Sequence, residues 1–169
     1  KLAKNISIFK KTVEEVVRGN PDALLIVEFA EKNKENNLKQ LSRLDEMMND
    51  LGFSWKNKNG GLVKIINKQL QLKVTEMRKS GLNIMMSMKT EEKPVSFVED
   101  CAVKLENLAE YTNGLKNIFK KYGVNGTWYA HASVGCLHVR PVLNMKLSKD
   151  VLKMRKIAKE ASNLIKKYQ

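Results

Sequence analysis

Apolar residues recur along this chain at two characteristic spacings, and these spacings predict where helices and strands lie. Apolar positions three or four residues apart mark one face of a helix, and they predict helices over residues 4–16, 38–51, 105–119 and 151–165. Residues 62–88 are also expected to be mostly helical, with Gly81 as a weak point. Short apolar runs predict strands at 23–29, 53–56 and 95–99, with a turn at 57–61.

Both histidines of the chain fall in a segment that predicts a β-hairpin. Its turn is expected at Val134-Gly135, where glycine can adopt the positive φ that tight turns need. In that register His131 lies opposite His138, and Tyr129 lies opposite Arg140, with all four side chains on one face. Opposed residues have Cβ atoms roughly 4.5–5.5 Å apart. Two imidazoles at that separation could hold one metal ion.

Other interpretations of these residues stay open at this point. Two facing histidines can simply hydrogen-bond to each other, and two ligands are too few for a typical zinc or iron site. Cys136 shares the face of the histidines, but a small residue beside a turn is interpreted as packing. The acidic pair Glu99-Asp100 is interpreted as negative charge ahead of the helix that follows it.

The alternation of strands with helices of 15 to 20 residues predicts an α+β fold. We expect a ferredoxin-like antiparallel sheet with helices packed mainly on one face. The length suits a single domain over residues 1–169. No run of about 18 apolar residues is present, so we expect no transmembrane helix. The chain starts without Met or a signal region and stops inside an expected helix, so we expect it to be a piece of a longer polypeptide.

Charge and cysteine content narrow the functional classes only slightly. The net charge of +13 invites a nucleic-acid interpretation, but only five of the 31 basic residues are arginine and the lysines are spread along the chain. Base recognition favours arginine and a clustered charge, so we expect no nucleic-acid partner, while an acidic partner surface stays open. The two cysteines, Cys101 and Cys136, favour a reduced, cytoplasmic setting, with peripheral attachment to a membrane as the alternative.

Four segments together resemble one known family. Residues 131–138 read H-A-S-V-G-C-L-H and resemble the H-A-G-D-G-N-L-H motif in the C-terminal domain of FAD-linked oxidases. Residues 21–29, 77–82 and 94–100 resemble other segments of that domain, in the same order. The family includes D-lactate dehydrogenases, the D subunit of glycolate oxidase and D-2-hydroxyglutarate dehydrogenases. The A-S-V-G-C variant departs from the common motif.

The resemblance implies a role for several residues. His131 and His138 match a pair of metal-binding histidines, for zinc or else iron or manganese, and Arg78 matches a substrate-binding arginine. Arg140 stands where the family often has a substrate-contacting asparagine, and the change suggests a larger or more anionic acid. The family's substrate-contacting lysine has no clear match, since the aligned position is about Val98.

The expected function is therefore the substrate- and metal-binding cap of an FAD-dependent dehydrogenase that oxidises a small D-2-hydroxy acid. The resemblance implies that FAD is bound mainly by a separate flavin domain. It also implies that a G-E-H-G motif, with a further metal ligand and a catalytic histidine, lies beyond this chain. We expect the chain alone to be inactive. A stand-alone metal- or anion-binding module and a basic nucleic-acid-binding domain are the alternatives.

Overall fold

The computed structural model describes residues 3, 6–57 and 60–168, and the chain divides into two compact units. The first unit is Lys1–Gly81 and the second is Leu82–Gln169. Each unit is described by itself below. The first residues of the helix expected over 4–16 and the middle of the turn expected at 57–61 lie outside the described residues.

The first unit is built from helices joined by irregular segments. Its elements are α1 (Ser7–Val16), α2 (Lys34–Asp50), the 3₁₀ turn η2 (Trp55–Asn57) and α3 (Lys68–Lys79). Asparagine side chains fix the start of two of these helices. Asn33 accepts from the amide of Glu35 in α2, and Asn67 accepts from the first amides of α3. Helix α1 packs against α3, where Val13 and Val74 are buried.

Three sequence predictions for this unit need correction. Residues 23–29 form no strand, and the run Leu24–Val27 is exposed. Strand 53–56 is also wrong, because Trp55 begins the turn η2 and its indole donates to the carbonyl of Leu62. The helix expected from residue 62 begins only at Lys68. The predicted weak point is confirmed, since α3 ends at Lys79 and a short helix, α4 (Gly81–Met86), follows.

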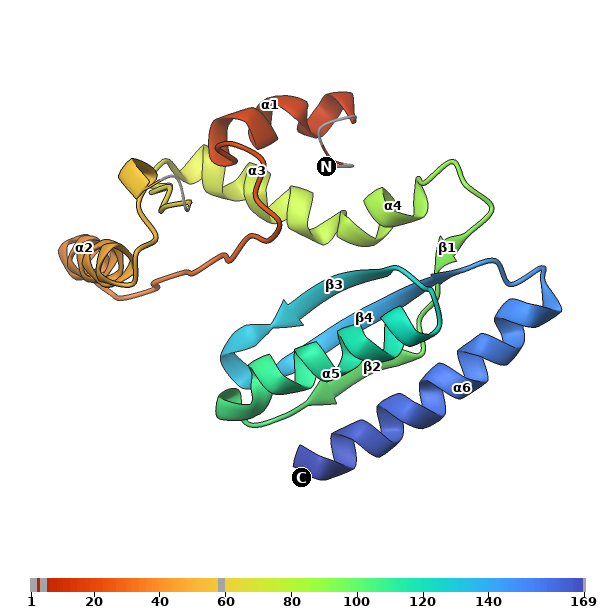
Figure 1. Cartoon of the computed structure of the whole chain (residues 1–169). Helices are drawn as coiled ribbons and strands as arrows, with labels where there is room; N and C mark the ends of the chain where they lie inside the picture. The colour runs from red at the N-terminus through yellow and green to blue at the C-terminus, as the bar shows by residue number, and fades with distance from the viewer. Residues whose placement is uncertain (1–2, 4–5, 58–59, 169) are drawn as a thin grey trace. The chain divides into compact units, whose positions relative to one another are not determined.

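The second unit carries an antiparallel sheet whose central strand is the last one (Figure 1). The strands are β1 (Lys93–Pro94), β2 (Val98–Ala102), β3 (Gly126–His131) and β4 (Cys136–Leu143). The helices are η3 (Leu105–Asn107), α5 (Leu108–Lys121), η4 (Ala132–Val134), α6 (Ser148–Ile165) and η5 (Lys166–Tyr168). Strand β4 pairs antiparallel with each of the other three strands. The path β2-α5-β3 leaves β4 between β2 and β3, which is the split β-α-β arrangement of ferredoxin-like folds.

Helices α5 and α6 cover one face of this sheet, which confirms the predicted α+β class and the one-sided packing (Figure 1). Side chains of β4 alternate strictly between buried and half-buried. The buried set is Leu137, Val139, Pro141 and Leu143, and it joins Tyr111, Leu115 and Phe119 of α5 and Ile157 and Ala161 of α6 in the core. Trp128 lies on this same face and packs against Phe119, with ring centroids 5.6 Å apart.

The hairpin forms, but its register differs from the predicted one. His131 pairs with Cys136, and His138 pairs with Tyr129 rather than with His131. The connection is a longer loop, the 3₁₀ turn η4 followed by Gly135, which has a φ of 66° as expected for a glycine here. A longer loop moves the pairing by two residues. Because side chains alternate with a period of two, a shift of two leaves every side chain on its predicted face.

Candidate functional site

The rings of three residues lie together on the face of the sheet opposite α5 and α6: Tyr129, His131 and His138. His131 and His138 have centroids 5.2 Å apart at an interplanar angle of 81°. Tyr129 completes the group, with its ring 5.6 Å from that of His131 and 5.8 Å from that of His138. We call these three residues the His–Tyr cluster. The two imidazoles therefore meet edge to face although the residues are not direct cross-strand partners.

Two consecutive carboxylates of β2 converge on this cluster. Asp100 Oδ1 lies 3.2 Å from His138 Nδ1, and Glu99 Oε2 lies 3.9 Å from the same nitrogen. The cause is a register shift in β2, where Val98 pairs with Val139 but Cys101 pairs with Leu137. Glu99 and Asp100 thus oppose the single residue His138, as in a β-bulge. The interpretation of this pair as helix-start charges is wrong, because the bulge directs both side chains to β4.

Arg140 is held by the first of these carboxylates. Its Nε donates to Glu99 Oε1, and only 16% of the Arg140 side chain is exposed. The hydrogen bond from Arg140 lowers the pKa of Glu99, against the opposing effect of burial. Glu99 therefore stays ionised at neutral pH. Arginine carries five N–H donors, so one donor bound to Glu99 leaves others that can reach a second anion.

Cys136 belongs to the same neighbourhood. Its sulfur, an oxygen of Asp100 and a nitrogen of His138 lie within 4.8 Å of one another. Burial raises the pKa of Cys136, and the charge of Asp100 raises it further. The thiol is consequently protonated at neutral pH unless a cation is bound. Sequence reasoning treated Cys136 as packing. Its place two residues before His138, on the same face of the strand, was the available indication of a closer relation.

These donors fit a divalent metal ion. An imidazole, a carboxylate and a thiol, from His138, Asp100 and Cys136, lie within 4.8 Å of one another, and the ring of His131 packs against that of His138. A mixed nitrogen, oxygen and sulfur set suits zinc or iron better than calcium or magnesium. The group of Glu99, Asp100 and Arg140 holds more negative than positive formal charge, which also favours a cation. The residues that could hold the ion are His131 and His138, with Asp100 and Cys136 near His138.

Arg78 is the one predicted site residue that belongs to the first unit. It lies in the last turn of α3, in the first unit. The His–Tyr cluster belongs to the second unit. Its role in substrate binding stays a prediction.

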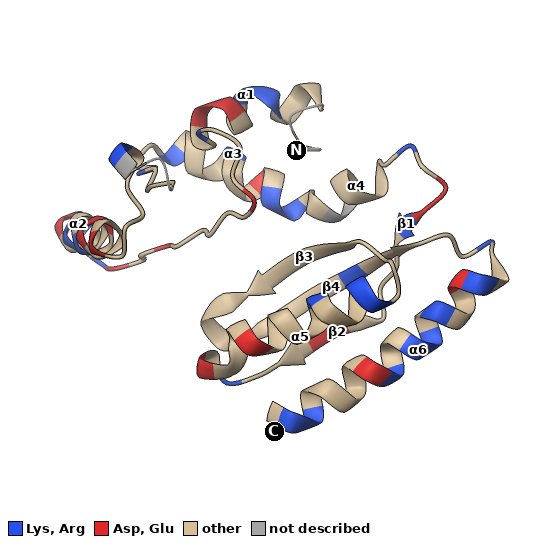
Figure 2. Ribbon diagram, in the orientation of Figure 1, with Lys and Arg blue, Asp and Glu red and all other residues tan. Residues whose placement is uncertain are grey.

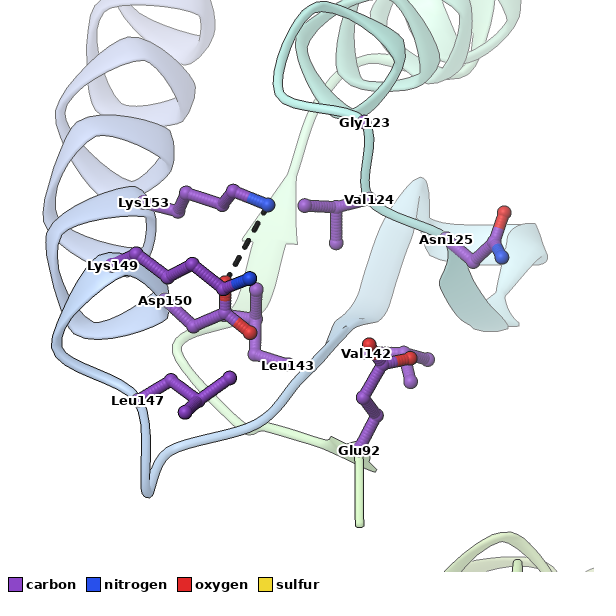
Figure 3. Close-up of a pocket in the computed structure, with 10 residues that line it drawn as sticks. All are labelled: Glu92, Gly123, Val124, Asn125, Val142, Leu143, Leu147, Lys149, Asp150 and Lys153. Carbon is purple, nitrogen blue, oxygen red and sulfur yellow. Dashed lines mark ion pairs between the residues drawn. The ribbon is translucent and has the colours of Figure 1, made fainter. Parts of the chain in front are cut away.

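A small pocket lies elsewhere in the second unit, at the start of α6 (Figure 3). It has a volume of about 110 Å³ and is lined by residues of β4, α6 and the turn after α5. Asp150 accepts from the amide of Asn144 and forms an ion pair with Lys153. The hydrogen bond from that amide lowers the pKa of Asp150. Neither histidine lines this pocket, and these contacts tie the loop after β4 to α6.

Comparison with known proteins places this arrangement in a family. The model of the family described as FAD linked oxidases, C-terminal domain, matches residues 3–169. The chain belongs to the FAD-linked oxidase family. This confirms the resemblance drawn from the four sequence segments. Among the residues that the structure describes, no helix has the length and apolar character needed to cross a membrane.

Three relatives of this FAD-linked oxidase domain are named as D-2-hydroxyglutarate dehydrogenases. A D-2-hydroxyglutarate dehydrogenase from Haemophilus influenzae is 28% identical over 170 residues, covering 99% of this chain and 17% of the relative. Another from Pantoea ananatis is 30% identical, covering 93% of this chain and 16% of the relative. A third, from Pseudomonas putida, is 33% identical over 96 residues. The chain thus spans about a sixth of the length of the relatives that it matches over its whole length.

Proposed function

We propose that this chain is the substrate- and metal-binding cap of an FAD-dependent dehydrogenase that oxidises a D-2-hydroxy acid to the 2-oxo acid. The His–Tyr cluster, on the sheet face away from α5 and α6, is the observation that carries the proposal. The relatives named as D-2-hydroxyglutarate dehydrogenases favour a dicarboxylic acid over D-lactate or glycolate. The relatives are about six times longer, which supports the idea that other parts of the enzyme complete the catalytic machinery.

The reaction removes a hydride from C2 of the hydroxy acid and a proton from its hydroxyl group, which leaves a carbonyl. FAD, bound mainly outside this chain, supplies the acceptor of the two electrons. His131 and His138 would hold a divalent metal, which would supply Lewis acidity to lower the pKa of the substrate hydroxyl. We assign no general base to this chain.

The residues of the chain itself bind and orient the acid. Arg140 offers a planar set of donors that matches a carboxylate. Glu99 fixes the guanidinium through Nε, so that its orientation is set before the substrate arrives. Tyr129 packs against both imidazoles and limits their rotation. Arg78 is proposed as a second carboxylate contact.

The proposal is tested with the full-length protein and a dye as artificial electron acceptor. D-2-hydroxyglutarate, D-lactate and glycolate are compared as substrates, with the L-acids as controls. We expect turnover of a D-acid, and His131→Ala or His138→Ala should lower kcat more than the roughly 10–100-fold typical of changes outside the ligand sphere. Flavin content should not change, since the metal acts on the substrate.

Val134→Ala is the matched control for the histidine variants. Val134 lies in the same hairpin and is exposed, so it should retain full activity. Turnover of no D-2-hydroxy acid by a flavin-loaded protein would overturn the proposed reaction. Full activity of both histidine variants would overturn the metal centre.

A further inference from the structure

We propose that Asp100 is the positioning residue of the metal centre: its carboxylate holds His138 through Nδ1, so that Nε2 is the atom presented to the metal. The inference rests on the proposed function and deepens it. It adds a residue to which the resemblance gave no role. Three observations support it: the positive φ of Asp100, the bulge in β2, and the different partners of the adjacent carboxylates Glu99 and Asp100.

Asp100 has a backbone conformation that its side chain disfavours. Its φ is 56°, and no other non-glycine residue in the described part of the chain has a positive φ. The left-handed region is unfavourable for L-residues, although aspartate tolerates it better than most. Strain of this kind persists only where the surrounding structure enforces it, and it concentrates at functional sites.

The strained residue is half of the bulge, and the bulge determines where its side chain points. In a regular strand, Glu99 and Asp100 would lie on opposite faces of the sheet. The extra residue in β2 lets both of them address His138 and its face. Bulges next to active sites characteristically redirect a side chain in this way.

The two carboxylates then take different partners. Glu99 is bound by Arg140, and its nearer oxygen to His138 is still 3.9 Å away. Asp100 lies at 3.2 Å from Nδ1, within hydrogen-bonding distance. A histidine that ligates a metal through one nitrogen usually donates its other N–H to a carboxylate, which fixes the tautomer and raises the basicity of the ring. The distance of 3.2 Å between Asp100 Oδ1 and His138 Nδ1 suits this role.

Zinc affinity of the full-length protein tests the role directly. Metal is removed, and the affinity for Zn²⁺ is measured by competition with a chromophoric chelator. Asp100→Ala should weaken Zn²⁺ binding roughly 10–100-fold. Asp100→Asn should lose less, because its amide oxygen still accepts from Nδ1–H. His138→Ala should lose more. Cys136→Ala, which removes a candidate ligand but leaves the contact between Asp100 and His138 in place, is measured beside these variants. Glu106→Ala, an exposed acidic residue of η3, is the control.

The thermal unfolding midpoint of Asp100→Gly distinguishes the positioning role from a merely structural role, because the two predict opposite changes. Glycine adopts positive φ without strain, so its unfolding midpoint should equal or exceed that of the wild type while Zn²⁺ affinity falls. A structural aspartate would instead lower the midpoint on removal.

Three results would overturn the proposal. Unchanged Zn²⁺ affinity in Asp100→Ala would remove the role of Asp100 and leave the proposed function intact. Equal losses in Asp100→Asn, Asp100→Ala and Cys136→Ala would make Asp100 a direct ligand beside Cys136. Unchanged Zn²⁺ affinity in His138→Ala would overturn the metal centre itself, and the positioning role with it.

Discussion

At the residue scale, the register shift in β2 gives the neighbouring carboxylates of Glu99 and Asp100 different partners. Glu99 forms the partly buried ion pair with Arg140, and Asp100 contacts His138. An ion pair whose side chains are 25% and 16% exposed is screened less by water than a surface pair. Glu99 therefore contributes to stability as well as to the site.

Glu99→Gln should lower the free energy of unfolding by about 1.5–3 kcal/mol at pH 7, the range for a hydrogen bond to a charged group. Equilibrium unfolding in urea measures this loss. Glu91→Gln is the matched control, because Glu91 and Lys146 form an ion pair at an exposed position. Exposed pairs contribute little, so the control should unfold like the wild type. Equal stability of Glu99→Gln and the wild type would contradict the role of the pair.

The advantage of the wild type over Glu99→Gln should also depend on pH. Arg140 holds the pKa of Glu99 below its usual value of 4.5, so the folded protein binds fewer protons there than the unfolded chain. The contribution of Glu99 is therefore complete above pH 4.5 and is lost as the pH falls through the lowered pKa. Urea unfolding across this pH range should show the two proteins converging in acid.

The residues of the site were predictable from the sequence to different degrees. The face shared by His131, His138 and Arg140 follows from the two-residue period of a strand, and it survived an error of two residues in the register. The contacts of those residues with Glu99 and Asp100 could not be predicted from this period. Asp100 reaches His138 through a bulge, and no local pattern in residues 98–102 announces an extra residue in the ladder.

At the element scale, the hairpin loop leaves no room for a side chain at Gly135. Gly135 has a positive φ, and a Cβ added there would lie 1.9 Å from the backbone oxygen of Val103. The amide of Val103 also donates to the carbonyl of Gly135. The loop is therefore packed against the chain that follows β2. This packing connects the loop between β3 and β4 to the end of β2, and all three strands carry residues of the candidate site.

Gly135→Ala should cost more stability than Gly123→Ala. Both residues have positive φ, but a Cβ at Gly123 would meet no atom within 4 Å. Backbone strain alone predicts a loss of roughly 1–2 kcal/mol at Gly123. The clash with Val103 adds about 1–3 kcal/mol at Gly135. Paired urea unfolding curves measure the difference. Equal losses would show that the loop moves away from Val103 at little cost.

The elements were predictable where their signals are local. Helices α2, α5 and α6 follow from their apolar spacing, and Asn67 marks the start of α3 through its side-chain oxygen. The failure at residues 23–29 has a different origin. A strand needs a partner for its backbone groups, and a run such as Leu24–Val27 does not reveal whether the fold supplies one. It is exposed here and forms no strand.

At the scale of the whole molecule, the net charge of +13 is not concentrated on the two hairpin strands that carry the candidate site. Lysines and arginines are interleaved with acidic residues along α6, and β3 carries no charged residue (Figure 2). Arg140 is the only Lys or Arg on the two hairpin strands. Within these two strands, Arg140 is therefore the one Lys or Arg side chain that could attract an anionic substrate to the His–Tyr cluster.

Arg140→Ala should discriminate between substrates in the full-length enzyme. If Arg140 binds the second carboxylate of D-2-hydroxyglutarate, its loss removes a contact worth roughly 1.5–3 kcal/mol, which corresponds to a 10- to 150-fold lower kcat/KM. D-lactate lacks that carboxylate, so it should lose much less. The loss should appear mainly in KM, since the contact is distant from the reacting carbon. Arg140→Ala leaves the negative charge of Glu99 unpaired, and this charge would repel an anionic substrate. The double variant Glu99→Gln with Arg140→Ala removes that repulsion, so that it reports only the lost attraction between Arg140 and the substrate. Equal losses for both acids in the double variant would deny Arg140 a role in selectivity and would assign it to Arg78 or to residues outside this chain.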